Sequence, residues 1–355
     1  MKRPTIADVA ERAGVTKAAV SFALNGQPGV SDATRERILA IAAEIGFQPS
    51  SAARALSDGR AGAFGLVVDR PASTLGVEPF FMQLISGIQA ELSSIQVPLL
   101  LTVAEDQTAE IELYRTWWAQ RRVDGVFLID LEFRDPRVAV LRELRMPAVV
   151  FGSPRAAQAL PAIWQDERAV TRLVVDHLTE LGHRRIARVG GIARYWHTKL
   201  RSDAFERVTA AVGVDAVSVA SDYTGEHGAE ATRELLLSTA PPTAIVYDND
   251  LMAVAGLSVA TAMGVEVPAE LSIVSWDDSI LCELVHPPIT SLRRDIAATG
   301  AEAARRLLAL ADGTPVGDFA EDLPVLTVRG STAPPPGPAA PPVLPTTGPP
   351  FRVPA

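Results

Sequence analysis

The segment from Thr5 to Ser21 constrains this chain most, because its pattern predicts two short helices joined by a tight turn. Thr5 and Asp8 have the spacing of a capping box, which marks the start of a helix. Gly14 follows the first helix, where a glycine tolerates the positive φ that a turn requires. Thr16 can cap the second helix. The expected inner faces of the two helices recur at helical spacing and consist of Ile6, Val9, Ala10, Ala13, Val20 and Leu24.

A third helix is predicted after these two. Asn25-Gly26 ends the second helix, Ser31 lies at the start of the third, and the third runs to about Ile45. Two helices joined by such a turn form a helix-turn-helix, whose second helix normally enters the major groove of DNA. An ordinary helical hairpin is the alternative at this point.

The order of short motifs in this region resembles the DNA-binding head of the LacI/GalR family of bacterial repressors. Within residues 4–57 the matching motifs are Thr-Ile-x-Asp-Val-Ala, Ala-Gly-Val-Thr, Val-Ser-x-x-Leu-Asn, Val-Ser-x-x-Thr-Arg and Ala-Ala-Arg-Ala-Leu. The resemblance implies a DNA-binding domain over residues 1–49, and a hinge helix with its linker over residues 50–61. It implies DNA contacts from Thr5, Thr16, Lys17, Ala18, Ser21, Phe22, Asn25, Ser31, Arg54 and Leu56.

Two of these positions carry specific expectations. The resemblance implies that Leu56 wedges into the minor groove at a central C-G step and kinks the DNA. Phe22 occupies a base-reading position together with Lys17 and Ala18, but it cannot donate a hydrogen bond. It can touch only apolar edges such as a thymine methyl. The alternative is that Phe22 turns inward and packs between the helices.

Composition indicates a globular protein of two or three domains. The 355 residues are 48% apolar and 21% charged, and Cys282 is the single cysteine, so no internal disulfide forms. That cysteine usage, the lack of an apolar leader and the lack of a long apolar run predict a cytoplasmic protein outside the membrane. Net charge is −9, yet residues 1–60 carry +2. Because the head is only mildly basic, specific DNA binding is expected to need a dimer.

After residue 61 the pattern changes to alternating strands and helices, which is typical of a parallel α/β sheet. The rhythm runs through strands near 64–69, 98–103, 123–129 and 147–151 and then restarts with strands near 185–189, 217–220, 244–247 and 273–276. Helices are expected between them, near 80–92, 109–120, 136–144, 167–181, 201–212, 228–237 and 251–263. The elements near 289–292, 296–311 and 326–329 complete the pattern.

This repeat predicts an α/β, doubly wound, two-lobed domain over residues 62–330. The lobes resemble periplasmic sugar-binding proteins, which close on a ligand between them. The family resemblance implies three crossings between the lobes, expected near residues 160, 290 and 320. It also implies a role in effector binding and in dimerisation.

Residues 331–355 contain ten prolines and no periodic pattern. Such a composition cannot build a core and predicts a disordered tail. It also departs from the leucine-rich tetramerising helix that ends one member of the family. The chain is therefore expected to form a homodimer.

Polar residues follow two strands of the second lobe, where ligands of parallel sheets bind. The resemblance implies effector contacts from Phe80, Phe81, Arg201, Tyr223, Asn249 and Asp277. Acidic and arginine side chains bind vicinal hydroxyls, and aromatic rings stack on the apolar face of a sugar. A sugar-like effector is expected on these grounds.

Structural roles compete with these functional ones. Asp248, Asp250 and Asp278 are favoured as helix N-caps, and at least one of Phe80 and Phe81 is expected in the core. An enzyme is the other functional class considered. The five histidines lack metal-ligand spacing, and the chain has neither Gly-x-Ser-x-Gly nor a Walker loop. No catalytic residue, metal or cofactor is therefore predicted.

Overall fold

The computed structural model describes residues 4–47, 60–70 and 76–337. The first of these ranges forms a three-helix head from α1 (Ile6–Ala13), α2 (Lys17–Leu24) and α3 (Asp32–Glu44). The capping box of Thr5 and Asp8 is formed, and Gly14 ends α1 with a φ of 63°. Val9, Val20 and Ile38 are fully buried and form the small core that holds the helices together. The predicted helix-turn-helix is confirmed.

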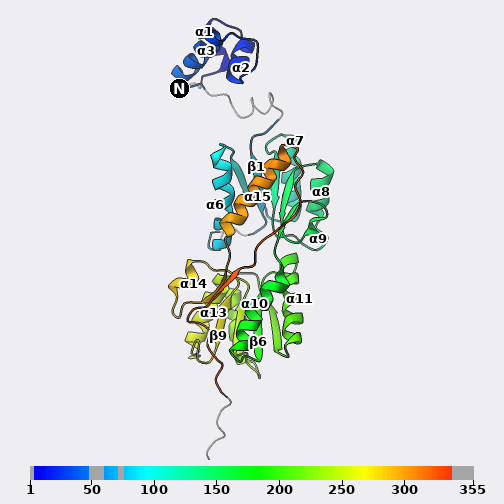
Figure 1. Cartoon of the computed structure of the whole chain (residues 1–355), viewed down its shortest axis with the longest axis vertical. Coiled ribbons are helices and arrows are strands. Elements are labelled where there is room, and N and C mark those ends of the chain that lie inside the picture. Colours follow the sequence, from blue (N-terminus) through cyan, green and yellow to red (C-terminus); the bar gives the residue numbers. More distant parts are fainter. Residues whose placement is uncertain (1–3, 48–59, 71–75, 338–355) are drawn as a thin grey trace, which may run out of the picture.

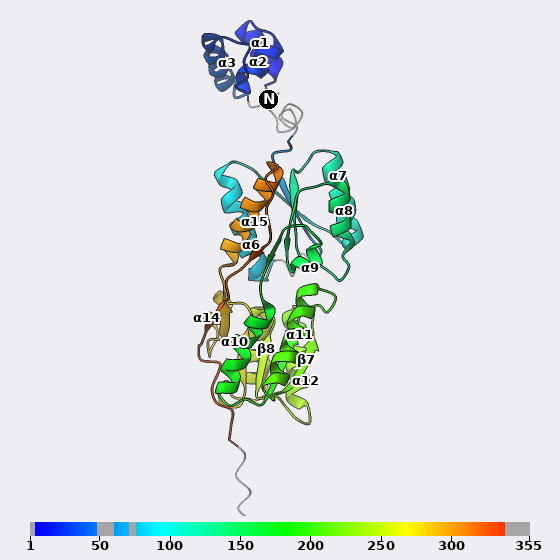
Figure 2. The ribbon, with the colours of Figure 1, turned by 45° about the vertical axis from the view of Figure 1, so that its right-hand side comes forward.

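The first lobe is a six-stranded sheet with the strand order β11-β5-β4-β3-β1-β2 and parallel pairing throughout. The strands are β1 (Phe64–Val68), β2 (Leu99–Val103), β3 (Gly125–Leu128), β4 (Ala148–Phe151), β5 (Ala162–Trp164) and β11 (Phe319–Ala320). Helices α6 (Pro79–Ser94) and α15 (Ile296–Ala311) cover one face, and α7 (Gln107–Ala119) and α8 (Pro136–Leu144) cover the other (Figures 1 and 2). The short α9 (Pro154–Ala157) precedes β5.

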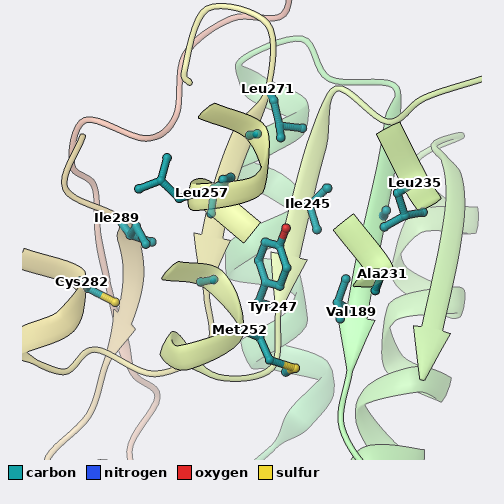
Figure 3. Packing of buried hydrophobic residues seen from close by; sticks show 14 of the residues in the cluster. Val189, Ala231, Leu235, Ile245, Tyr247, Met252, Leu257, Leu271, Cys282 and Ile289 are labelled. Carbon is teal, nitrogen blue, oxygen red and sulfur yellow. The ribbon is translucent and has the colours of Figure 1, made fainter. Parts of the chain in front are cut away.

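The second lobe repeats this plan with the order β12-β10-β9-β8-β6-β7, in which only the β10–β12 pair is antiparallel. Its strands are β6 (Arg185–Gly190), β7 (Asp215–Ala220), β8 (Ala244–Tyr247), β9 (Ser272–Ser275), β10 (Thr290–Arg293) and β12 (Val325–Thr327). Helices α10 (Glu167–Glu180) and α11 (Trp196–Ala211) pack on one face, and α12 (Gly225–Leu237) and α13 (Asp250–Ala262) pack on the other. Figure 3 shows the core beneath α13, with Ile245 and Tyr247 of β8 packed near Met252 and Leu257.

The chain crosses between the lobes three times, as expected. The crossings follow β5 at residues 165–166, follow β10 at residues 294–295, and join β11 to β12 through residues 321–324. The sequence reading missed four short elements, namely α9, β5, β11 and α14 (Ile280–Leu284). Within the described residues, no helix combines the length and the apolar character that a membrane crossing requires.

The expected start of a disordered tail at residue 331 is wrong for its first residues. Ser331 is fully buried, and its hydroxyl donates to the carbonyl oxygen of Ile273 at 2.6 Å. The backbone N–H of Ala333 donates to the hydroxyl of Ser272 at 3.1 Å. These bonds tie the segment to the second lobe, because small polar residues here pair with an adjacent strand. The prediction for residues 338–355 lies outside the described residues.

Candidate sites in the head and between the lobes

Helix α2 presents an outward face that carries the predicted DNA-reading residues. Lys17, Ala18 and Phe22 are exposed on it, and Ser21 and Asn25 are half-buried beside them. Phe22 remains 39% exposed, although one edge of its ring lies against Gly29. The ring therefore does not pack between the helices, which was the alternative considered.

Thr5, Thr16 and Ser31 each form the N-cap of a head helix and accept a hydrogen bond from a backbone N–H of the first turn. All three lie at exposed helix N-termini, which favour phosphate groups. Arg35 was not predicted. Its guanidinium donates to the carbonyl oxygens of Ala23 and Gln27 at 3.1 and 2.7 Å and so fixes the end of α2. Arg54 and Leu56 lie outside the described residues.

A pocket of about 830 Å³, including its opening to solvent, lies between the two lobes. Both lobes and all three crossings contribute to its wall. The lining residues that the argument uses are Arg70, Glu78, Phe80, Asp130, Gln165, Glu167, His197, Arg201, Tyr223, Asp248, Asp277 and Arg294. Four of the six predicted effector residues, Phe80, Arg201, Tyr223 and Asp277, are among them.

The other two predicted residues do not line the pocket. Phe81 is 1% exposed and packs in the core of the first lobe, as expected for at least one of the two phenylalanines. Asn249 is buried as the N-cap of α13, where its side-chain oxygen accepts from the N–H of Met252 at 2.9 Å. Its amide nitrogen donates to the carbonyl oxygen of Tyr223 at 3.0 Å. Asn249 therefore supports Tyr223, whose φ of 71° lies in the left-handed region.

The interpretation of three aspartates as helix caps is wrong, because Asn249 caps α13 and Ser279 caps α14. Asp248 lies on the pocket wall and accepts from Arg188 Nε at 2.7 Å. Asp278 accepts from Arg329 at 2.7 Å. Asp250 is the first residue of α13 and is not its cap. Two of these carboxylates therefore pair with arginines, Asp248 with the buried Arg188 and Asp278 with the partly buried Arg329, since a buried charge requires a partner.

On the first-lobe side, Arg70 is the centre of the pocket's electrostatics. Its guanidinium donates to Asp130 at 2.9 Å and to Glu78 at 3.0 Å, and it lies 4.8 Å from the ring centre of Tyr223. Burial raises the pKa of Glu78 to about 7, against the pull of Arg70. Burial is also the largest single effect on Asp130, but the charge and hydrogen bond of Arg70, together with other nearby groups, outweigh it and lower the pKa of that carboxyl. Arg70 thus pairs with the carboxyl groups of both Asp130 and Glu78, and Asp130 is the more firmly ionised of the two.

On the second-lobe side, Arg201 lies in α11 and pairs with Glu167 of α10 at 3.2 Å. Asp248 lies 3.9 Å from the same guanidinium, and the ring centre of Trp276 lies 5.0 Å from it. Asp277 accepts from Arg294 of the second crossing at 2.9 Å. Arginines and carboxylates therefore alternate around the wall and hold one another in fixed positions.

His197 is a neutral polar group in this wall. Its Nε2 lies 2.7 Å from the hydroxyl of Tyr223, which also bonds to Thr198 at 3.0 Å. Burial, and next the nearby charge of Arg201, lower the pKa of His197 to about 3. An uncharged imidazole offers one donor and one acceptor.

Two buried donors of the pocket wall have no hydrogen-bond partner in the described part of the chain. They are Nε2 of Gln165, on the first crossing, and Nε of Arg294, on the second. A buried donor without an acceptor is costly, so each favours an acceptor from a bound molecule. Together with carboxylates and with the ring of Phe80, they suit a ligand that has many hydroxyls and apolar faces.

Several pocket residues were missed by the sequence reading. Arg70 and Asp130 follow β1 and β3, so the strand-end rule that pointed to Asp277 also applies to them. Gln165 and Arg294 had no such signal, because they lie on crossings whose position depends on the packing of both lobes. In the described residues, no group of three or more His, Cys, Asp or Glu side chains is arranged to hold a metal ion.

Comparison with known proteins relates both parts of the chain to one class of regulator. Residues 5–50 match the bacterial regulatory proteins of the lacI family, and residues 175–332 match a periplasmic binding protein-like domain. The transcriptional regulator CelR of Thermobifida fusca is 33% identical over 312 residues, which cover 86% of this chain and 92% of CelR. The regulator MalR of Streptomyces coelicolor is 33% identical over 347 residues, which cover 94% of this chain and 97% of MalR.

Solved structures agree with these matches. In a solved complex of the regulator CelR with cellobiose, the CelR chain is 31% identical to this chain, with a TM-score of 0.70. The match covers 93% of this chain and all of the CelR chain. The lac repressor dimer bound to operator and the anti-inducer ONPF is 26% identical, with a TM-score of 0.82, covering 94% of this chain and all of that one. The chain therefore belongs to the LacI family and is a transcriptional regulator with a helix-turn-helix head and a two-lobed, periplasmic-binding-protein-like domain.

Proposed function

We propose that this regulator binds a pseudo-palindromic operator as a homodimer, and that a saccharide bound between its lobes switches that binding. The pocket carries the proposal, because both lobes and all three crossings line it. A ligand held there contacts both lobes at once, so it can bias their relative position. The residues proposed to contact it are Phe80, Arg201, Tyr223 and Asp277, with Arg70, Gln165 and Arg294 added by the geometry.

The chemical class of the effector follows from the residues that line the pocket. Paired arginines and carboxylates offer fixed donors and acceptors to hydroxyl groups, and the two buried donors without partners add two more. A relative of similar length is described in complex with cellobiose, and another is a MalR regulator. We therefore infer a disaccharide or a short oligosaccharide of glucose as the effector.

Thermal shift of the full-length protein tests this inference. Cellobiose, maltose and their trisaccharides are compared with matched concentrations of nucleosides and of monosaccharides. A ligand at 100 times its Kd stabilises the folded state by about 2.7 kcal/mol, which gives a clear shift. A shift with nucleosides only would overturn the saccharide assignment and leave a regulator of another ligand class.

In the head, we propose that α2 reads the half-site through Lys17, Ala18 and Phe22 while the three N-caps face phosphates.

Leu56 and Arg54 are proposed to act in the minor groove. Leu56→Ala is expected to weaken operator binding and to remove DNA bending, with effector binding unchanged. Equal operator affinity in a gel-shift titration would exclude the wedge role.

A further inference from the structure

The two lobes touch directly at a place that is not one of the crossings. Residues 131–133, which follow β3 of the first lobe, meet residues 194–196, which precede and begin α11 of the second lobe. The N–H of Trp196 donates to the carbonyl oxygen of Leu131 at 2.7 Å, and Glu132 and Tyr195 form an antiparallel β-bridge. We name these two segments the interlobe clasp.

Side chains reinforce the backbone contact of the clasp. Arg194 Nε donates to a carboxylate oxygen of Glu132 at 2.8 Å, and a second Arg194 nitrogen lies 3.7 Å from Asp69. The rings of Phe133 and Trp196 are stacked, with centres 5.3 Å apart and planes 18° from parallel. Trp196 also packs against the core of the first lobe. Trp196 of the second lobe is thus partly buried by the first lobe.

The exposure of Phe133 is unusual for a residue with only a structural role in one lobe. Its side chain is 60% exposed, and its stacking partner belongs to the opposite lobe. Separation of the lobes at this point would expose to water the ring face that stacks on Trp196. It would also break the ion pair and the backbone bond.

The clasp is covalently adjacent to the pocket on both sides. Leu131 follows Asp130, which pairs with Arg70, and Trp196 precedes His197, which bonds to Tyr223. Both Asp130 and His197 line the pocket. The lobes therefore cannot separate around a ligand at these two residues while the clasp stays formed.

We propose that the interlobe clasp holds the lobes in the arrangement of this structure, here called the closed form, before any ligand binds, and so sets the fraction of molecules that is competent to retain a ligand. Its effect on ligand affinity rests on the proposed function, but its effect on the lobes does not. An ion pair at the surface and a stacked aromatic pair together stabilise the closed form modestly. When only the closed form retains ligand, apparent affinity falls in proportion to its population.

The test compares the variant E132Q/F133A with the matched control D215N/L237A in the full chain. The control also removes one carboxylate of an exposed ion pair and one exposed apolar side chain, but both lie within the second lobe. Spin labels are placed at exposed positions, one in each lobe, as Glu143→Cys and Glu234→Cys. Cys282 is buried, and labelled chains are diluted with unlabelled ones so that each dimer carries one labelled pair.

Pulsed electron spin resonance then measures the distance between the lobes without ligand. The wild type and the control are expected to give one narrow distribution, and E132Q/F133A is expected to add a population with a different separation. Cellobiose or maltose, whichever shifts the wild-type melting temperature, is expected to bind the clasp variant about 5- to 30-fold more weakly.

The outcomes separate the two proposals. A wild-type distance distribution in E132Q/F133A overturns the clasp and leaves the saccharide proposal intact. A new distance population in the variant, together with no response of the wild type to any saccharide, supports the clasp and removes the proposed effector. A variant that loses melting temperature but keeps both the distances and the affinity identifies the clasp as a structural contact only, which also overturns the proposal.

Discussion

At the residue scale, one exposed side chain in the head is predicted to determine part of the base preference of the regulator. Phe22 is 39% exposed on the outward face of α2, next to Lys17 and Ala18. Because its ring has no hydrogen-bonding group, it can recognise only apolar base edges such as the thymine methyl. The half-site is therefore expected to contain thymine at the position that Phe22 faces.

Phe22→Arg is predicted to change the preferred half-site toward guanine at one position, because a guanidinium donates two hydrogen bonds to the guanine edge. A gain of about 1 to 3 kcal/mol in discrimination is typical of such a bidentate contact. Selection from random oligonucleotides measures the change, with circular dichroism as the control for folding. An unchanged consensus from a folded variant would show that this side chain does not read bases.

In the pocket, Glu78 links pH to stability. Its pKa is raised by burial from 4.5 to about 7, so it contributes stability that is present below about pH 4.5 and is lost as pH rises through about 7. Glu78→Gln retains the uncharged form at every pH. The variant is predicted to gain about 1 to 3 kcal/mol over the wild type as pH rises from about 5 to about 8.

Melting temperatures of both proteins from about pH 4.5 to about pH 8 measure this difference, because that window spans the ordinary and the raised pKa of the carboxyl. The same substitution at the exposed Glu143 serves as the control. A difference between the Glu78→Gln variant and the wild type that is constant with pH, or that shrinks as pH rises, would contradict the assigned role of burial at Glu78.

At the element scale, α6 and α15 form one closely packed pair that begins at the pocket. Phe80 near the start of α6 and Ile296 at the start of α15 both line it. The helices lie side by side in both views (Figures 1 and 2), and their backbones touch through glycines. A Cβ on Gly87 would lie 1.9 Å from the carbonyl oxygen of Ala297, and one on Gly300 would lie 2.3 Å from that of Leu84.

Gly87→Ala is predicted to destabilise the protein by about 1 to 3 kcal/mol, because backbone atoms cannot move aside as a flexible side chain would. This loss exceeds the helix propensity that alanine adds. Gly317→Ala is the control, since a Cβ there meets nothing within 4 Å. Calorimetry should show a lower melting temperature for Gly87→Ala alone, and equal melting temperatures of the two variants would contradict the close packing of α6 on α15.

The arrangement of elements was largely predictable, because buried parallel strands appear as apolar runs between amphipathic helices. The missed elements β5, β11, α9 and α14 have two to five residues each, too few for a periodic pattern. The expected helix at 201–212 begins instead at Trp196, so Arg201 lies inside α11 and faces Glu167. The polar residues His197, Thr198 and Lys199 interrupt the apolar pattern in the first turn of this helix.

The pocket was predictable only in part. Phe80, Arg201, Tyr223 and Asp277 came from motifs, whereas the role of Asp248 was misjudged because its partner Arg188 lies 60 positions away in the sequence. Arg294 and Gln165 enter the wall only when both lobes are assembled. Long-range ion pairs and crossings between lobes leave no local pattern in the sequence.

At the scale of the whole molecule, the C-terminal segment belongs to the second lobe as far as Ala333. The residues from 338 onward are predicted to play no part in assembly, because this proline-rich segment lacks the apolar heptads of a tetramerising helix. Deletion of residues 338–355 should leave two chains per particle in light scattering and an unchanged operator affinity. Deletion from Ala333 should lower the melting temperature as well, since it removes bonds to Ser272. Four chains per particle for the full protein would contradict the dimer.

At this scale the proposed function predicts that ligand bound in the pocket between the lobes controls DNA binding by the head. Coupling between two such sites is typically about 1 to 3 kcal/mol, which is about 5- to 150-fold in affinity. Asp277 is the residue on which this control should depend most, because its carboxylate is held by Arg294 on the pocket wall. Asp278 is the matched control, since its carboxylate pairs with Arg329 and does not line the pocket.

The most direct measurement is the operator affinity of full-length protein by fluorescence anisotropy, on a selected operator, with and without the saccharide that raises the melting temperature. The wild type and Asp278→Asn are predicted to change affinity by about 5-fold or more when the saccharide saturates them. Asp277→Asn is predicted to bind the operator normally and to show no change. Equal affinity of the wild type with and without saturating saccharide, or a full response in Asp277→Asn, would contradict ligand control through the pocket between the lobes.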